Sequence, residues 1–378
     1  MTSLLPDEPN DQGSLFDPAP APPLAGVVAA AVPTPEVLDL SAHLARAWGR
    51  QIRLGTSSWY FPGWAGLVWA RSYSEAAVVK HGLAAYAQHP LLGTVSLDRS
   101  FYRPVDVATY ARLAAQVPAG FRFMVKAPAS VTDATVREAG SGRALQPEML
   151  APGRRIRQPP PVGAATVLGA ARHTVANPLF LDPATALEAA LRPAVAGLGD
   201  KLGVLVFQLS PLPRSWLADQ DALHQRLERL LAAIADELPA GALCAVEVRD
   251  PELLTPAFAR LLVAHGARYC LGLHNRMPPI AEQLPMLRAQ WPGPLVCRWN
   301  LQRGLAYERA KNLFEPFDKL AAPDPATRQA LARVMVATAQ AGHPVFVAIN
   351  NKAEGSAPLS VIELAREMFA PLPSSSAG

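Results

Sequence analysis

The sequence predicts an α/β protein built on a single (β/α)8 barrel of the TIM type. Strand-like apolar runs alternate with helix-length amphipathic segments along most of the 378 residues. The alternation gives eight units, and eight parallel strands joined by right-handed crossovers close into a barrel. Half of the residues are hydrophobic, which is enough apolar material for one large core. An open, doubly wound sheet is the alternative architecture.

The first 49 residues are predicted to form a disordered or poorly ordered extension, so the barrel is expected to span residues 50–372. Proline, alanine and aspartate dominate the chain up to Pro35, without a helix or strand period. The 38 prolines are about twice the ordinary share, and many of them lie in this segment.

The predicted strands are short runs rich in apolar and β-branched residues. In chain order they are Ile52–Thr56, Thr94–Asp98, Phe121–Lys126, Gly203–Gln208, Leu243–Arg249, Arg268–Leu273, Leu295–Trp299 and Val345–Ile349. The predicted helices lie between and after these strands, and each has an amphipathic period. They are Ala76–Gln88, Val107–Gln116, Ala184–Leu198, Asp221–Glu237, Pro256–His265, Ile280–Ala289, Ala326–Gln340 and Pro358–Phe369.

One segment interrupts the alternation after the third strand. Residues 135–172 are rich in glycine, proline and arginine and have no clear period. They are predicted to form a loop inserted on the C-terminal face of the barrel. Three arginines in it, Arg154, Arg155 and Arg157, are expected to be solvated or to contact an anionic partner.

Charge and cysteine content favour a protein of the reducing cytoplasm. The formal net charge of +4 is too small to indicate nucleic-acid binding by itself. All three cysteines, Cys244, Cys270 and Cys297, lie in apolar strand-like runs and are expected to be buried free thiols. Neither a signal peptide nor an apolar span of membrane length is evident, so no membrane association is expected.

Polar residues at the strand ends are the candidates for a functional site, because in such barrels the chemistry lies where the strands end. Glu247 and Arg249 are two apart on one predicted strand and project to the same face as Ala245. Glu247 and Asp98 are candidates for acid/base catalysis, and Arg249 for anion binding. A structural salt bridge is the alternative for Glu247 and Arg249. Lys126 is a candidate catalytic amine or anion ligand, with simple charge pairing to Glu247 or Asp98 as the alternative.

The other strand-end residues are assigned to substrate binding. His274 is the histidine best placed for proton transfer near neutral pH, with an ordinary hydrogen-bonding role as the alternative. Aromatic residues after the first two strands are expected to stack on a ligand or to close the barrel top. The full set is Arg249, Arg298, Gln208, Asn351, Ser57, Trp59, Tyr102 and His274.

No cofactor or metal is expected from the motifs. Walker-type phosphate loops and paired zinc-ligand spacings are missing from the sequence. Asp98, Glu247 and His274 are the one set that could converge as metal ligands. A Gly-x-Ser-x-Gly nucleophile motif is also missing, so the sequence does not favour serine hydrolase chemistry.

Six ordered motifs resemble the YecE-like family, also called domain of unknown function 72. The resemblance covers residues 50 to about 370 and implies a TIM barrel without an established activity. The motifs are Gly55–Trp59 with Trp64 and Gly66, Ser100–Arg103, Phe123–Lys126, Leu202–Gln208, Val246–Arg249, and Ile349–Asn351 with Gly355, Ala357 and Pro358. Three family residues are replaced: the first-strand glycine by Ser58, a glutamate by Ser96, and the histidine of a Thr-His pair by Asp133.

Two functions follow from these residues. The first is a cofactor-free enzyme, of hydrolase or lyase type, that acts on a phosphorylated or other anionic small molecule or nucleic-acid component. The alternative is a barrel that binds a ligand or partner without turning it over, as the replacements at Ser96 and Asp133 suggest.

A short run in the N-terminal extension resembles the peptide with which bacterial repair proteins bind the DNA sliding clamp. Gln12, Leu15 and Phe16 match that pattern, whereas Gly13 departs from it. An extended peptide can insert two adjacent apolar residues into a groove. Sliding-clamp binding and an inert leader are the two interpretations of this segment.

Overall fold

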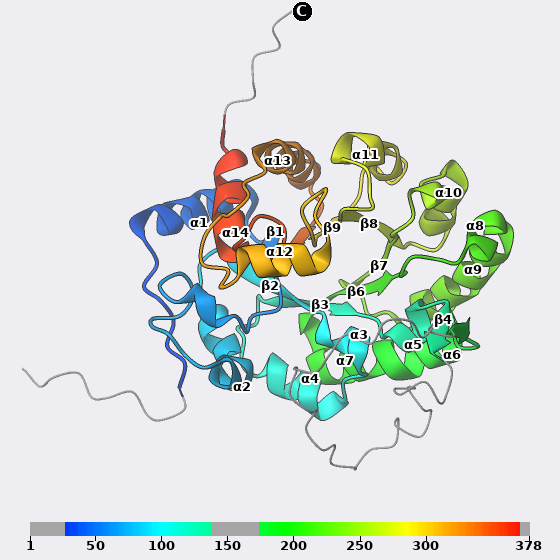
Figure 1. Ribbon diagram of the computed structural model, residues 1–378, viewed down its shortest axis with the longest axis horizontal. Coiled ribbons are helices and arrows are strands. Elements are labelled where there is room, and N and C mark those ends of the chain that lie inside the picture. The colour runs from blue at the N-terminus through cyan, green and yellow to red at the C-terminus, as the bar shows by residue number, and fades with distance from the viewer. Residues whose placement is uncertain (1–26, 138–173, 371–378) are drawn as a thin grey trace, which may run out of the picture.

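Eight parallel strands form a closed barrel, which confirms the predicted fold class (Figure 1). The computed structural model describes residues 27–137 and 174–370. Around the barrel the order is β1–β10–β9–β8–β7–β6–β3–β2, so an open sheet is excluded. The strands are β1 Ile52–Ser57, β2 Leu92–Leu97, β3 Arg122–Lys126, β6 Leu202–Gln208, β7 Leu243–Glu247, β8 Arg268–Leu273, β9 Leu295–Trp299 and β10 Val345–Ile349.

Alternate residues of each strand face the inside of the barrel. A compact inner cluster fills it, and its members recur every second residue: Met124, Val204, Val206, Ala245, Cys270, Val296, Phe346 and Ala348. The intervening residues, including Cys244, Val246 and Val248, pack outward against the helices. The predicted inward face of β7 is therefore confirmed, and the three cysteines are buried and free.

Helices surround the strands, and those that follow a strand return the chain to the opposite end of the barrel (Figure 1). None in the described part of the chain is long and apolar enough to cross a membrane. Their bounds are α1 Pro35–Trp48, α2 Glu75–Tyr86, α3 Arg99–Tyr102, α4 Val107–Ala114, α5 Ala129–Thr132, α6 Pro183–Ala186, α7 Arg192–Leu198, α8 Arg214–Ala218, α9 Gln220–Glu237, α10 Pro256–Ala264, α11 Ile280–Arg288, α12 Tyr307–Phe314, α13 Pro325–Gln340 and α14 Ala357–Glu367.

The helix α1 corrects the prediction that residues 1–49 lack regular structure. Thr34 caps it by accepting a hydrogen bond from the Val37 amide, and Pro35 occupies the first turn, where proline needs no amide donor. The helix lies along α14, and Trp48 stacks on Phe369 with ring centroids 5.4 Å apart. Tertiary packing therefore orders a segment whose composition indicated a tail.

The insertion after the third strand begins and ends in a small antiparallel ribbon. Thr135–Arg137 (β4) pairs with Thr174–Ala176 (β5), although the sequence predicted no regular structure from residue 135. The arginine cluster at 154–157 and the sliding-clamp-like run at 12–16 lie outside the described residues.

Candidate active site at the barrel mouth

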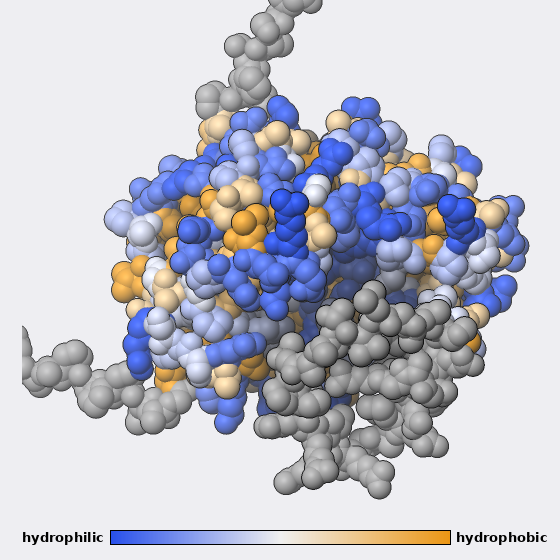
Figure 2. Space-filling view, viewed as in Figure 1, coloured by the Kyte–Doolittle hydropathy of each residue, from blue (hydrophilic) through white to orange (hydrophobic). Residues whose placement is uncertain are grey.

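The candidate site lies at the C-terminal ends of the strands. Because the inner cluster recurs every second residue, the next inward positions after Val206, Ala245 and Val296 are Gln208, Glu247 and Arg298. Lys126 follows Met124 by the same rule. Figure 2 shows a hydrophilic hollow in the region where Figure 1 places β7, β8 and β9.

Arg298 is the centre of the network and is 1% exposed. Its Nη1 donates to Glu247 Oε2 at 2.5 Å, and its Nη2 donates to Asp98 Oδ1 at 2.6 Å. These contacts join β9 to β7 and to the loop after β2. Gly272 and Ala348 are its register partners on the neighbouring strands, and a Cβ at Gly272 would lie 3.3 Å from Glu247 Cγ, so glycine there leaves room for the Glu247 side chain.

Glu247 is fully buried and bound by three side chains. Besides Arg298, it contacts Arg249 Nη2 at 2.7 Å and accepts a hydrogen bond from Asn300 Nδ2 at 3.0 Å. Burial by itself raises the pKa of this carboxyl, but the charges of Arg249 and Arg298 outweigh burial and hold the pKa below its ordinary value. Glu247 is therefore an ionised structural anion at neutral pH, and the salt-bridge alternative is the one that the geometry favours.

Asp98 is also ionised at neutral pH. It accepts a hydrogen bond from Ser96 Oγ at 2.7 Å in addition to the contact from Arg298. Burial raises the pKa of Asp98, but Arg298 and Lys126 outweigh burial and leave the pKa lowered. Neither Asp98 nor Glu247 carries a proton to donate at neutral pH.

Lys126 is the buried amine of the site. It is 7% exposed, and its Nζ lies 3.5 Å from the centroid of the Phe101 ring. None of the hydrogen bonds and ion pairs among the described residues engages this amine, so no carboxylate fixes its proton. Burial, reinforced by the charge of Arg298, lowers the pKa of Lys126 to about 7. A large share of the amine is then neutral and nucleophilic at physiological pH.

Asp133 is a site residue that the sequence analysis noted only as a departure from the family pattern. It follows α5, is partly buried, and its Oδ1 has no hydrogen-bond partner among the described residues. Burial raises its pKa, and the smaller effects of Ser210 and of the Lys126 charge oppose that rise. A partly buried carboxyl with a raised pKa that interacts electrostatically with Lys126 is an acid/base candidate. Its departure from the Thr-His pair of the family was the available signal.

Two buried donors of the network are unpaired among the described residues: Arg249 Nη1 and Arg298 Nε. Both guanidinium groups also donate to Gln208 Oε1, from Arg249 at 2.9 Å and from Arg298 at 3.1 Å. Buried donors of this kind are normally satisfied by water or by a ligand acceptor. With the Lys126 amine, they make the mouth suited to an anionic ligand.

Asn351 and Trp59 belong to the scaffold, and their predicted substrate-binding roles are not supported by the geometry. Ala348 faces the inside of the barrel, so the alternation of side chains directs Asn350 inward and Asn351 outward. Asn351 Oδ1 instead accepts from Trp64 Nε1 at 3.1 Å and from the Ala357 amide at 2.8 Å. Trp59 is 1% exposed and donates to the Val78 carbonyl of α2.

Ser57, Tyr102 and His274 lie at the mouth with different properties. Ser57 is buried at the end of β1, and its Oγ has no partner in the described chain. Tyr102 is 74% exposed, and the charge of Asp98 contributes to raising its pKa. Burial and the charge of Arg249 lower the pKa of His274 to about 4. His274 is therefore neutral at pH 7 and a poor proton donor there, which favours the alternative of an ordinary hydrogen-bonding role.

Asn300 and Ser96 complete the ion-paired network, although the sequence analysis did not assign them to the site. Asn300 lies two residues after Arg298, so the strand period was the available signal for it. In the described part of the chain, no three His, Cys, Asp or Glu side chains are grouped to hold a metal ion, and Asp98, Glu247 and His274 do not form such a set.

Comparison with known proteins gives the family. The model described as protein of unknown function DUF72 matches residues 53–375. A DUF72 family protein from Thermotoga maritima has 16% sequence identity and a TM-score of 0.52, with 85% of this chain and 100% of that chain covered. A DUF72 family protein from Enterococcus faecalis has 16% identity and a TM-score of 0.50, with 85% and 97% covered. No curated protein matches the chain.

The two structural matches support the barrel fold, and the family model covers most of the sequence. The chain therefore belongs to the DUF72 family of TIM-barrel proteins, whose function is unknown.

Proposed function

We propose that this protein is a lyase-type enzyme that acts on a small anionic substrate with a carbonyl group, and that Lys126 is its nucleophile. The observation that carries the proposal is the buried Lys126 amine, which has no ion-pair or hydrogen-bond partner in the described chain and a pKa of about 7. An ordinary lysine, with a pKa near 10.4, is almost fully protonated at neutral pH.

The chemistry begins when the neutral amine attacks the carbonyl carbon. The carbonyl oxygen takes up a proton, and loss of water from the resulting carbinolamine leaves an iminium ion on Nζ. That cation accepts the electron pair released when a neighbouring C–C or C–H bond breaks. Asp133 is the group that we assign to these proton transfers, because burial raises its pKa and the opposing effect of the Lys126 charge indicates that the two groups interact.

Anion binding is assigned to the two guanidinium groups. Arg249 Nη1 and Arg298 Nε are buried donors without a partner among the described residues, and both groups are fixed by Gln208 and Glu247. A phosphate or carboxylate oxygen of the substrate would satisfy these donors. Glu247 and Asp98 then act as positioning residues that hold the arginines in place.

Reductive trapping tests the nucleophile. The protein is incubated near pH 7 with cyanoborohydride and, separately, pyruvate, dihydroxyacetone phosphate or glyceraldehyde 3-phosphate. We expect at least one of them to add its mass to the peptide containing Lys126, and Lys126→Arg to remove that adduct. Adducts spread equally over exposed lysines such as Lys80, unchanged in Lys126→Arg, would contradict the proposal.

A ligand-binding barrel without turnover is the second candidate, and a specific observation favours it. Both buried carboxylates are locked in ion pairs with lowered pKa values, as a structural network requires. If phosphate raises the melting temperature, Arg249→Lys weakens that effect, and no carbonyl compound is trapped on Lys126, the binding function is the one to retain.

A further inference from the structure

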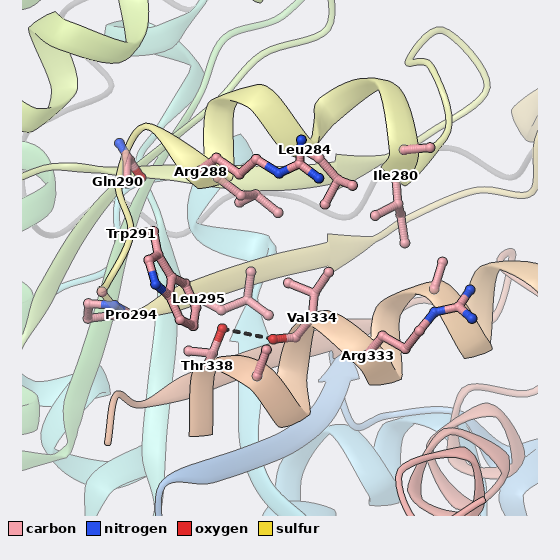
Figure 3. A pocket seen from close by; sticks show the side chains of 15 residues that line it. Ile280, Leu284, Arg288, Gln290, Trp291, Pro294, Leu295, Arg333, Val334 and Thr338 are labelled. Atoms are coloured by element: carbon pink, nitrogen blue, oxygen red, sulfur yellow. Dashed lines mark hydrogen bonds between the residues drawn. The ribbon is translucent and has the colours of Figure 1, made fainter. Parts of the chain in front are cut away.

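Outside the barrel mouth, the structure has a cavity of about 390 Å³ on the outer surface between α11 and α13 (Figure 3). This volume lies within the usual range for small-molecule sites, about 300–1,000 Å³. Leu295, at the start of β9, forms part of the lining, so the cavity reaches the opposite end of that strand from the candidate active site.

The lining of this groove is mostly apolar. Leu284 and Leu287 of α11 face Ala330 and Val334 of α13, and all four side chains are only partly buried although they pack on the core. Trp291 lies at one end, with 53% of its surface exposed. Partly exposed apolar walls around a hollow are typical of a site that a hydrophobic ligand covers.

The charged side chains of the groove are all positive. Arg288 of α11 and Arg333 of α13 flank it on opposite walls, as Figure 3 shows. Neither arginine takes part in an ion pair within the described residues, and no described acidic side chain lines the groove. The groove therefore combines an apolar channel with two cations at its rim.

We infer that this groove binds an amphipathic anion, namely an aliphatic chain that ends in a carboxylate. The chain would lie along the leucine and valine side chains, and the carboxylate would pair with Arg333, while Arg288 adds positive charge on the opposite wall. This site is separate from the lysine chemistry proposed above, so either proposal can fail without the other.

Calorimetric titration of the full-length protein with dodecanoate, below its micelle concentration, tests the inference. We expect one molecule to bind per chain with a dissociation constant below about 1 mM. Arg333→Gln should weaken the binding of dodecanoate about two- to fivefold, as expected for the loss of an exposed ion pair. The binding of dodecanol, which has no charge, should stay unchanged. The matched control is Arg229→Gln, an exposed arginine of α9 away from the groove.

Variants that fill the groove with a larger side chain provide the decisive test. Ala337 lines it from α13 and is exposed, so Ala337→Trp should fold normally and lower dodecanoate affinity more than tenfold. Ala281→Trp does the same from the opposite wall if the first variant is unstable. Unchanged affinity in both filled variants, or no binding by the wild type, would overturn the inference. A wild-type dimer in light scattering that Ala337→Trp dissociates would instead assign the groove to a second copy of the chain.

Discussion

At the scale of single residues, the barrel mouth is decided by which buried charges find a partner. Arg298 and Glu247 are almost completely buried, and each satisfies the other at 2.5 Å. Lys126 lies beside them without such a contact and is 7% exposed. Ion pairing therefore keeps Glu247 and Arg298 charged against the opposing effect of burial, whereas burial lowers the pKa of the unpaired Lys126.

Glu247→Gln should destabilise the protein by about 3–5 kcal/mol at pH 7, because it leaves two buried arginines without their anion. The folded-state pKa of Glu247 is lowered, so its stabilising effect is present above the unfolded value near 4.3. The effect is lost as the pH falls through the folded pKa, so the difference between variant and wild type should shrink in acid.

Urea denaturation at pH 7 and at successively lower pH measures this difference. The exposed Glu252→Gln is the matched control and should stay within about 0.5 kcal/mol of the wild type throughout. A loss at pH 7 no larger for Glu247→Gln than for Glu252→Gln would refute the role of Glu247 as the structural anion.

Acetylation of Lys126 by acetic anhydride should reach half of its maximal rate near pH 7, because only the neutral amine reacts and its pKa is about 7. Peptide mass spectrometry after brief labelling at a series of pH values measures the rate, and exposed lysines such as Lys80 provide the internal comparison. A Lys126 rate that still rises steeply up to pH 10 would show that its pKa is ordinary.

At the scale of secondary-structure elements, α1 shows how tertiary contacts determine order. Its sequence begins among prolines, but Val37 is 5% exposed and Trp48 stacks on Phe369 beyond α14. Glu36 also pairs with Arg366 of α14 on the surface. These contacts come from the two ends of the described chain, so no local pattern could indicate them.

Val37→Ala should destabilise the protein by about 1–2 kcal/mol, because it removes buried methyl groups between α1 and the core. Its neighbour Leu38 is 50% exposed, so Leu38→Ala should change the free energy of unfolding by less than about 0.5 kcal/mol. Urea denaturation of both variants measures the difference. Equal effects would mean that α1 does not pack as described.

At the scale of the whole molecule, barrel closure depends on close contact between the first two strands. Gly55 of β1 pairs with Thr94 of β2, and a Cβ at Gly55 would lie 1.9 Å from the Thr94 carbonyl oxygen. That oxygen also accepts a hydrogen bond from the Tyr86 hydroxyl of α2. Glycine at this position is therefore a requirement of the closed barrel.

Gly55→Ala should destabilise the barrel by about 1–3 kcal/mol, because β1 and β2 must separate to admit the methyl group. Gly93→Ala is the matched control on β2, since its Cβ would come no closer than 3.8 Å to another atom. Thermal unfolding of the two variants compares them. Similar melting temperatures would show that strand contact at Gly55 is looser than the structure indicates.

The alternation of strands and helices, the inward period of two and the family motifs were all present in the sequence. They predicted the closed barrel, the shared face of Glu247 and Arg249, and the mouth as the place of Lys126, Gln208 and Arg298, because a parallel barrel brings all its strand ends to one face. These properties depend on local pattern and on a topology with few alternatives.

Only the tertiary structure decided which of these residues pair. Arg298 bridges Asp98 and Glu247 across 200 and 51 residues of sequence, a choice that depends on register and on the space beside Gly272. The same register turns Asn351 toward Trp64 and away from the lumen. Burial and ion pairing, which together set the pKa values at the site, are properties of the closed barrel and cannot be read from sequence spacing.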